Sequence, residues 1–349
     1  MAETILTIDL DALASNYTAL DAQSGAGTET AAVVKANAYG LGIEVAGPKL
    51  AAAGAKTFFV ATTEEAARLA KVIGPNPDIF VFGGLLAEDA KLFEAENFIP
   101  LLNSVEQVQA YLAHPNQTGF GLQLDTGMNR LGMEEDELRT ALTLLGNNRP
   151  TLVISHLACA DEPDHPMNQA QLTEFNRLTD GMNWKRSLGA TGGTLLGPEF
   201  HFDLTRPGIG LYGGAPFTDA KPVVHLDIPV IQTRTVKTGE SVGYGASWTA
   251  QRDSKVATIS AGYADGLNRA MGSGSVNLYA QDVACPLIGR VSMDLLTVDV
   301  TDVPEVPTHL TLLNAAQTVD DLAAAAGTIG YEFLTSLGAR YQRRYVGLE

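Results

Sequence analysis

The chain has 349 residues, enough for two domains, and its formal net charge of −17 argues against a surface that binds nucleic acid or an anionic membrane. Cys159 and Cys285 are the only cysteines, which excludes a disulfide framework and a cysteine-rich metal site. The first residues lack the basic and apolar regions of a signal peptide, and no segment is long and apolar enough to span a membrane. We therefore expect a cytoplasmic protein that binds neither nucleic acid nor membrane.

Up to about residue 220, apolar runs typical of strands alternate with segments in which apolar residues recur at helical spacing. Strands are expected at residues 4–10, 31–35, 57–61, 79–82, 98–102, 120–124 and 151–155, with weaker ones at 186–188 and 202–204. Helices are expected at residues 13–20, 45–53, 63–69, 87–93, 104–112, 134–145 and 168–179. Asp9 or Asp11 can cap the first helix.

Such alternation indicates a parallel sheet with crossover helices. Roughly eight units over this length fit a TIM-like (β/α)8 barrel, and no GxGxxG motif follows the first strand to favour a dinucleotide fold. We expect the fold class α/β, with the barrel in residues 1–220; residues 1–10 join either the barrel or the second domain. Chemistry in such a barrel lies at the C-terminal strand ends.

The remaining residues, 221–349, predict a mainly β second domain, because short β-rich runs are separated by glycine turns. Pro229 indicates an edge or a bend in the strand expected at residues 222–236. The other expected strands are residues 255–260, 275–280, 283–288 and 295–300, and one short helix is expected at residues 320–326.

A lysine stands at the end of the second strand, in the run VVKANAYGLG of residues 33–42. A lysine that leaves water can lose its proton more easily and become a nucleophilic amine. The structural alternative is a strand-end lysine whose stem reaches back to solvent. From these residues alone, we favour that alternative for Lys35.

The run resembles the pyridoxal-phosphate lysine motif of alanine racemases. The resemblance implies that Lys35 holds the cofactor covalently and that Tyr39 contacts its phosphate. Further motifs of that family follow in the same order, and together they extend from residue 8 to residue 345.

Two of these motifs lie at barrel strand ends. LQLDTGMNRLG, residues 122–132, implies that Arg130 lies near the substrate carboxylate; a surface salt bridge with residues 134–137 is the alternative. Gln123 stands where many relatives have a lysine, carbamylated in some, so it or a bound anion would orient Arg130 instead. ISHLACADE, residues 154–162, implies that His156 stacks beside the cofactor ring and hydrogen-bonds the arginine below it. A metal at His165 lacks ligand spacing, and we expect no metal.

The phosphate motifs follow. SLGATGG, residues 187–193, has Ala190 and Thr191 where relatives usually have asparagine and serine; Thr191 keeps a hydroxyl for the phosphate. TRPGIGLYG, residues 205–213, implies that Arg206 faces the pyridine nitrogen, and that Gly208 and Ile209 offer backbone N–H groups. The resemblance also implies that the Tyr331 hydroxyl contacts the cofactor phosphate. The residues implied to bind the cofactor are thus Lys35, Tyr39, His156, Thr191, Arg206, Gly208, Ile209 and Tyr331.

Two motifs of the second domain complete the resemblance. ISAGYADG, residues 259–266, implies that Tyr263 is the acid/base opposite Lys35, acting in the partner subunit of a homodimer. On its own, a glycine-flanked tyrosine at a strand end reads as an ordinary turn residue. GRVSMD, residues 289–294, implies that Met293 of the partner also reaches the substrate carboxylate.

The expected function is therefore interconversion of L-alanine and D-alanine by a two-base mechanism, with pyridoxal 5′-phosphate as cofactor, supplying D-alanine for peptidoglycan. Lys35 would serve the D enantiomer and Tyr263 the L enantiomer. Two alternatives stay open: a racemase of broader or serine specificity, and a non-catalytic pyridoxal-phosphate carrier. The second domain, with Tyr263 and Met293, argues against a carrier.

Overall fold

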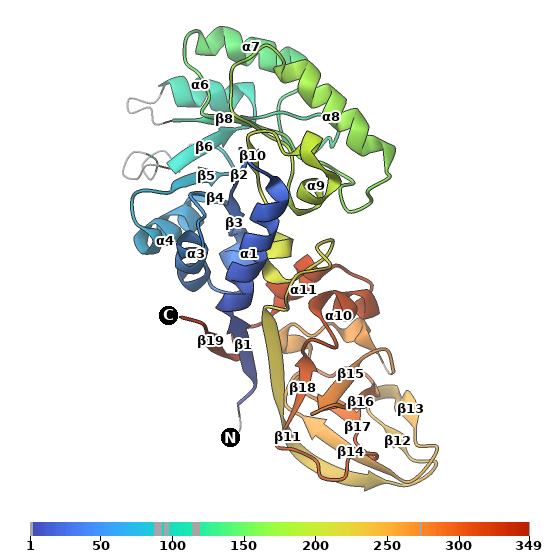
Figure 1. Cartoon of the computed structure of the whole chain (residues 1–349). Coiled ribbons are helices and arrows are strands. Elements are labelled where there is room, and N and C mark those ends of the chain that lie inside the picture. The colour runs from blue at the N-terminus through green and yellow to red at the C-terminus, as the bar shows by residue number, and fades with distance from the viewer. Residues whose placement is uncertain (1–2, 87–92, 94–97, 114–118, 273, 349) are drawn as a thin grey trace. The chain divides into compact units, whose positions relative to one another are not determined.

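The computed structural model describes residues 3–86, 93, 98–113, 119–272 and 274–348 (Figure 1). The chain divides into two compact units. One comprises Leu13–Leu211 and Pro216–Asp219, and the other comprises Met1–Ala12, Tyr212–Ala215 and Ala220–Glu349. The first few residues therefore belong with the C-terminal part of the chain.

The larger unit is built on a curled, parallel sheet whose strands follow one another in chain order from β3 to β9. Its strands are β3 (Ala32–Val33), β4 (Thr57–Val60), β5 (Asp78–Val81), β6 (Phe98–Leu102), β7 (Gly121–Gln123), β8 (Leu152–Ile154) and β9 (Arg186–Ser187). Apart from the exposed Asp78 and the half-buried Arg186, every residue of these strands is buried. Strands buried on both faces are expected where helices cover a parallel sheet.

Two short strands close this sheet into a barrel. β2 (Glu29–Thr30) runs directly into β3 and pairs in parallel with β10 (Leu204–Thr205). The backbone N–H of Ala31 donates to Thr205 O in β10, that of Val33 donates to Pro207 O beyond it, and that of Arg206 donates to Gly189 O, just after β9. Residues 29–33 and 204–207 thus act as the first and eighth strands, which confirms the TIM-like fold class.

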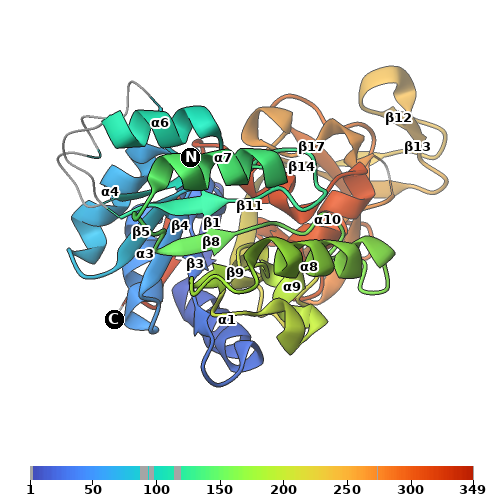
Figure 2. The same cartoon turned by 90° about the horizontal axis from the view of Figure 1, so that it is seen from above.

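Helices surround the strands of this barrel (Figure 2). The first, α1 (Leu10–Ser24), is capped by Asp9, whose Oδ1 accepts from Ala12 N–H at 2.9 Å. The others are α3 (Ile43–Ala52), α4 (Thr63–Ile73), α6 (Val105–Ala113), α7 (Glu135–Leu145), α8 (Pro166–Thr179) and the short α9 (Thr191–Leu196). In α7, the buried residues Leu138, Ala141 and Leu145 recur at helical spacing and form its core face.

These bounds lie within a few residues of those expected from the sequence. The helix expected at residues 87–93 falls almost entirely outside the described residues. The backbone conformation of the short turn between β3 and α3 was not expected from the sequence.

The second unit contains a closed β barrel, since β11 (Val224–Val236) pairs with both β18 (His309–Leu313) and β14 (Ser254–Ile259). The strands β17 (Leu296–Asp299), β16 (Val283–Ile288) and β15 (Asn277–Ala280) complete the ring. β1 (Ile5–Asp9) and β19 (Gln342–Val346) extend the sheet beside β11, and β12 (Ser241–Val242) pairs with β13 (Trp248–Thr249). The mainly β character of this part is confirmed.

Pro229 does not place β11 at an edge, because β11 has neighbours on both sides. Pro229 lies opposite His309 of β18, and the pairing with β14 begins at the next residue, Val230. The proline thus occupies the point where β11 exchanges one partner for another, which needs fewer ladder hydrogen bonds there.

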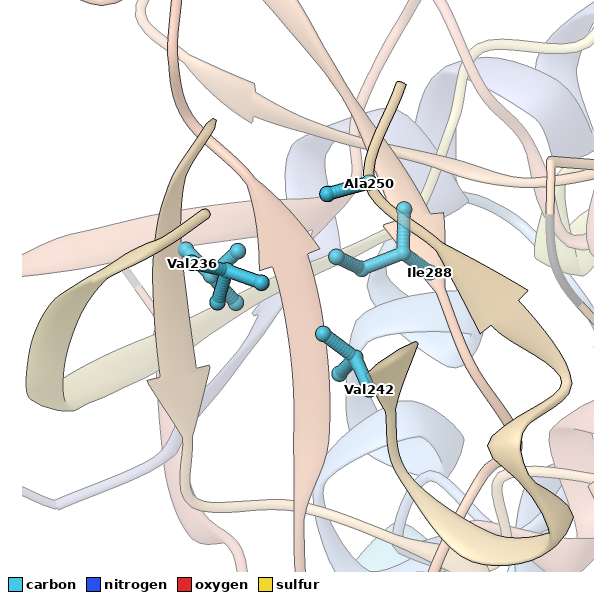
Figure 3. Close-up of a cluster of buried hydrophobic side chains, with 5 residues drawn as sticks. Val236, Val242, Ala250 and Ile288 are labelled. Carbon is cyan, nitrogen blue, oxygen red and sulfur yellow. The ribbon is translucent and has the colours of Figure 1, made fainter. Parts of the chain in front are cut away.

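A small cluster of buried apolar side chains forms part of the core of the second unit (Figure 3). It consists of Val236, Val242, Ala250, Val256 and Ile288. Two helices lie near the end of the chain: α10 (Val319–Ala326) was expected, whereas α11 (Gly330–Ser336) was not. In the part of the chain that the structure describes, none of the helices has the length and apolar character needed to cross a membrane.

Candidate active site

A cavity of about 120 Å³ opens where the strands of the larger barrel end. Four of its lining residues are basic side chains that the sequence analysis selected: Lys35, Arg130, His156 and Arg206. The others are Ala61, Phe82, Gln123, Leu131 and Ile154. The barrel therefore gathers into one hollow four residues separated by up to about 170 positions, as expected for strand ends of this fold.

Lys35 stands two residues after the end of β3, and its ammonium nitrogen lies 5.5 Å from the centre of the Phe82 ring. Burial, followed by the positive charge of Arg130 and then that of Arg206, lowers the pKa of Lys35, while Glu65 opposes this shift. A lowered pKa makes the neutral, nucleophilic amine easier to form. Lys35 is therefore not the solvent-directed lysine of the structural alternative.

The backbone after Lys35 forms a left-handed turn. Ala36, Asn37, Ala38 and Tyr39 have φ values of 53°, 57°, 54° and 53°, and Gly40 follows with φ 83°. Such conformations cost roughly 1–2 kcal/mol for each residue other than glycine. Four of them in succession require surrounding contacts that fix the turn.

Glu65, in the first turn of α4, supplies two of these contacts. Its Oε1 accepts from the backbone N–H of Asn37 at 3.1 Å, and its Oε2 accepts from that of Ala61 at 2.9 Å. The Asn37 side chain in turn accepts from Ile43 N–H and from Arg68 Nη2, at 3.1 and 2.6 Å. One carboxylate and one amide thus hold the left-handed turn against the next strand and helices.

Arg206 is almost completely buried and has no carboxylate partner among its observed hydrogen bonds. Its guanidinium donates to the carbonyl oxygens of Ser155 and Leu188, at 2.6 and 3.4 Å, and to the hydroxyl of Ser187. Burial lowers the pKa of Arg206 to about 9, so the group stays protonated near neutral pH. The site therefore has a fixed positive charge at its base.

His156 is held as a neutral imidazole. Burial, together with the charges of Arg206, Arg130 and Lys35, lowers its pKa to about 3. The expected hydrogen bond between His156 and Arg206 is not among those observed in the described residues. A neutral His156 therefore adds no positive charge to the cavity.

Arg130 lies on a loop shaped by Asp125, whose carboxylate accepts from the N–H groups of Gly127 and Arg130 at 2.7 and 3.2 Å. Gln123 donates from Nε2 to Leu131 O at 3.1 Å. Gln123 therefore acts on the chain beside Arg130, and its observed bond is not to the guanidinium. No ion pair of the described residues joins Arg130 to the acidic run of residues 134–137.

A second cluster lies around Gly208. The Thr191 hydroxyl oxygen accepts from the backbone N–H groups of Gly208 and Gly210, at 3.0 and 3.2 Å. A Cβ at Gly208 would lie 2.3 Å from the Tyr39 hydroxyl oxygen, so only glycine fits there. The amides of Gly208 and Gly210 thus hold the Thr191 hydroxyl, which together with the Tyr39 hydroxyl and the amide of Ile209 makes a group of donors suited to an anion.

Three of the expected site residues lie in the other unit, and each is well exposed. Tyr263 begins a 3₁₀ turn after β14 and is 42% exposed, Met293 is 53% exposed, and Tyr331 in α11 is 40% exposed.

Some residues of the site were not selected from the sequence. Ala61 and Phe82 line the cavity because each follows a buried strand, a position that could have identified them. Glu65 carried only the signal of a helix start, and Ser187 none at all. Among the described residues, no three His, Cys, Asp or Glu side chains gather as metal ligands.

Comparison with known proteins gives matches along nearly the whole chain. Residues 8–216 match the family model described as alanine racemase, N-terminal domain, and residues 223–345 match that of the C-terminal domain. A protein named alanine racemase from Dinoroseobacter shibae is 58% identical over 347 residues, which cover 99% of both chains. The likeness thus includes the second unit as well as the barrel.

Solved structures show the same relationship. An alanine racemase from Bartonella henselae, described with covalently bound pyridoxal phosphate, has a TM-score of 0.92 and 37% identity, covering 99% of this chain and all of its own. The biosynthetic alanine racemase from Pseudomonas aeruginosa has a TM-score of 0.90 and 37% identity, with 99% of both chains covered. With both family models matched and relatives this similar over their full length, the chain belongs to the alanine racemase family.

Proposed function

We propose that this protein interconverts L-alanine and D-alanine, with pyridoxal 5′-phosphate held on Lys35. The observation that carries the proposal is the cavity at the barrel strand ends. It brings an amine of lowered pKa together with Arg130, His156 and Arg206. An amine that is easily neutral is what Schiff-base chemistry with a carbonyl compound requires.

The residues of the barrel fit this cofactor. The cradle formed by Tyr39, Thr191 and Gly208, with the amide of Ile209, suits a phosphate group, and glycine at 208 leaves room for the Tyr39 hydroxyl. Arg206 would face the pyridine nitrogen, and neutral His156 would lie against the ring. We assign Tyr331 to the phosphate as a further hydroxyl donor.

When bound, the cofactor supplies an electron-accepting ring that acidifies the Cα–H bond of an attached amino acid. A protonated Arg206 at the ring nitrogen would donate a hydrogen bond to it and so leave it unprotonated, which would keep the ring a weak acceptor and limit side reactions. Arg130 and Met293 would bind the substrate carboxylate. The remaining step is proton transfer at Cα, which needs one base on each face.

We assign the two bases to Lys35 and Tyr263. Lys35 would take the proton of the D enantiomer and Tyr263 that of the L enantiomer. Tyr263 and Met293 would act in the partner subunit of a homodimer, and their exposure in a single chain, 42% and 53%, is compatible with such a role. A phenol needs a nearby positive charge to act as a base near neutral pH, and Arg206 is the group that we assign to this task.

The test is purified protein with pyridoxal phosphate and D-alanine in D₂O, followed by optical rotation and by deuterium at Cα. Loss of rotation with deuterium incorporated is expected. A protein that binds the cofactor but leaves D-alanine unchanged would contradict the proposal and favour a carrier.

The same assay with serine and larger side chains separates an alanine racemase from one of broader or serine specificity. Ala190 and Thr191, which replace the residues usual in relatives, are the reason to test this alternative. A rate with serine equal to that with alanine would favour it.

A further inference from the structure

The loop that carries Tyr263 is joined to the loop that carries Met293 through their backbones. The N–H of Tyr263 donates to Ser292 O, and that of Ala264 donates to Met293 O, each at 3.0 Å. A Cβ at Gly262 would lie 2.3 and 2.4 Å from these same two carbonyl oxygens. Position 262 therefore accepts only glycine, and the two loops form one assembly.

Asp265, the last residue of the Tyr263 turn, holds the turn closed through its side chain. It is only 5% exposed, and its Oδ2 accepts from the N–H of Gly262 at 2.9 Å. Arg340 donates to the same carboxylate with two nitrogens, Nε to Oδ1 at 2.6 Å and Nη2 to Oδ2 at 2.9 Å. Paired, parallel bonds of this kind fix orientation as well as distance.

Arg340 also reaches the other loop. Its third nitrogen, Nη1, donates to Asp294 Oδ1 at 2.8 Å, and Asp294 directly follows Met293. One guanidinium therefore spans both loops, which a lysine ammonium could not do with the same geometry.

The chain segment just before Arg340 is seated against the same turn. The N–H of Gly338 donates to Asp265 O at 3.0 Å, and a Cβ at Gly266 would lie 2.0 Å from Ser336 O. A 3₁₀ turn of three residues, Tyr263–Asp265, has few hydrogen bonds of its own. Its position is thus set by these outside contacts.

We infer that Asp265 and Arg340 are positioning residues for Tyr263, which hold its phenol at one face of the substrate while touching neither substrate nor cofactor. The inference rests on the proposed function, in which Tyr263 serves the L enantiomer. A residue that acts through Tyr263 alone must affect one face of Cα, whereas a residue needed only for folding must affect both faces equally.

The experiment measures the first proton removal, as loss of α-deuterium to water from 2-deuterated L-alanine and D-alanine, with the cofactor-loaded enzyme. The variants are Asp265→Asn, Arg340→Lys and Asp294→Asn, with Tyr263→Phe as reference. Asp302→Asn is the matched control, because it breaks the exposed Arg252–Asp302 pair of the same unit, whose nitrogen and oxygen are 2.6 Å apart. Amide hydrogen exchange in residues 262–266 is followed in parallel.

For Asp265→Asn we expect proton removal from L-alanine to decrease by about tenfold to a hundredfold, as for a displaced catalytic group, with D-alanine almost unaffected. The amides of Tyr263 and Ala264 should exchange faster. Arg340→Lys should give a smaller loss of the same sign and Asp294→Asn the smallest, so the series remains informative if Asp265→Asn does not fold.

The outcomes separate the two hypotheses. Equal losses for both enantiomers, or no loss, in variants of Asp265 and Arg340 would overturn the inference while Tyr263→Phe still shows the L-specific effect. If Tyr263→Phe itself lacks that effect, the assignment of Tyr263 in the proposed function is wrong, and the inference is overturned with it.

Discussion

The loops of the two proposed bases are held in place by different physical means. The turn after Lys35 is a strained, left-handed backbone in which the Asn37 N–H donates to Glu65 and the Asn37 side chain is bound from two sides. The Tyr263 turn has glycine where close approach demands it, and a buried carboxylate with a bidentate arginine fixes it. The Lys35 turn therefore has a strained backbone. The Tyr263 turn is unstrained, and the ion pair between Asp265 and Arg340 holds it in place.

This difference corresponds to the different roles proposed for Lys35 and Tyr263. Lys35 lies in the cavity at the strand ends and, in the proposed function, holds a cofactor at a fixed point, so a stiff backbone suits it. Tyr263 presents an exposed phenol, whose placement depends on the loop beneath it. Disturbing the Lys35 turn should therefore affect every property of the site, and disturbing the Tyr263 loop should affect one face of the substrate.

The largest effect is expected from Lys35→Ala, which removes the cofactor attachment and one base together. Racemisation should decrease by about 10³-fold or more in both directions, since loss of a base alone costs about 10²–10⁴. Mass spectrometry after borohydride reduction should find no cofactor on the chain. A variant that still retains reduced cofactor at another lysine would contradict the assignment of Lys35.

Tyr263→Phe sharpens the comparison, because it should separate the two faces. Proton removal from L-alanine should decrease by about 10²–10⁴-fold, while cofactor attachment to Lys35 is unchanged. Deuterium loss from each enantiomer is the measurement. Tyr279→Phe, in strand β15, is the control and should match the unaltered protein; equal losses from L-alanine and D-alanine in Tyr263→Phe would count against the assignment of faces.

Glu65→Ala should weaken the Lys35 turn by leaving the N–H groups of Asn37 and Ala61 without their acceptor. We expect the free energy of unfolding to decrease by about 1–3 kcal/mol, and racemisation to decrease by about tenfold in both directions. Urea unfolding and initial rates check this. Glu64→Ala, at the exposed neighbouring position, is the matched control.

A second substitution tests whether strain is the cause. Ala36→Gly, at an exposed position with φ 53°, should relieve roughly 1 kcal/mol of left-handed strain. It should therefore restore part of the activity lost in Glu65→Ala. If the double variant is no better than Glu65→Ala alone, the turn is not limited by strain, and the contrast between the two loops loses its basis.

These two loops also show what a sequence can and cannot predict. The position of Lys35 could be predicted because an apolar run buries a strand, and a strand end in a barrel faces the site. The left-handed turn could not, because alanine and tyrosine have no local preference for positive φ; Glu65, some thirty residues away, and its neighbours impose it. Asp265 likewise gave no signal, since its partner Arg340 is distant in the chain.

Other differences have similar causes. Pro229 is rare inside a sheet, but the partner exchange of β11 removes the need for its missing N–H. β19 was missed because its residues alternate between exposed and half-buried and include charged side chains. His156 lies just past a strand end, as predicted, but its charge depends on burial and on three cationic neighbours, which only the folded chain provides.

The smallest expected effect is on folding stability in acid. It should arise from His156, which lines the same cavity as Lys35. The folded pKa of His156, about 3, lies below the unfolded value of about 6.5. Below pH 6.5 the His156 imidazole therefore binds a proton in the unfolded chain but not in the folded chain. Folding stability thus decreases as the pH falls from 6.5 toward 3. Between pH 6.5 and 5.5 this contribution is about 1 kcal/mol.

His156→Asn should remove that part of the pH dependence, measured as the difference in urea unfolding free energy between pH 6.5 and 5.5. His225→Asn, in β11 of the other unit, is the control, so that the titration of all remaining groups cancels in the comparison. If His156→Asn leaves this pH dependence unchanged, His156 takes up its proton in the folded chain as it does in the unfolded chain. The cavity would then gain a further cation in acid, and His156 would join Arg206 as a candidate for the charge that assists Tyr263.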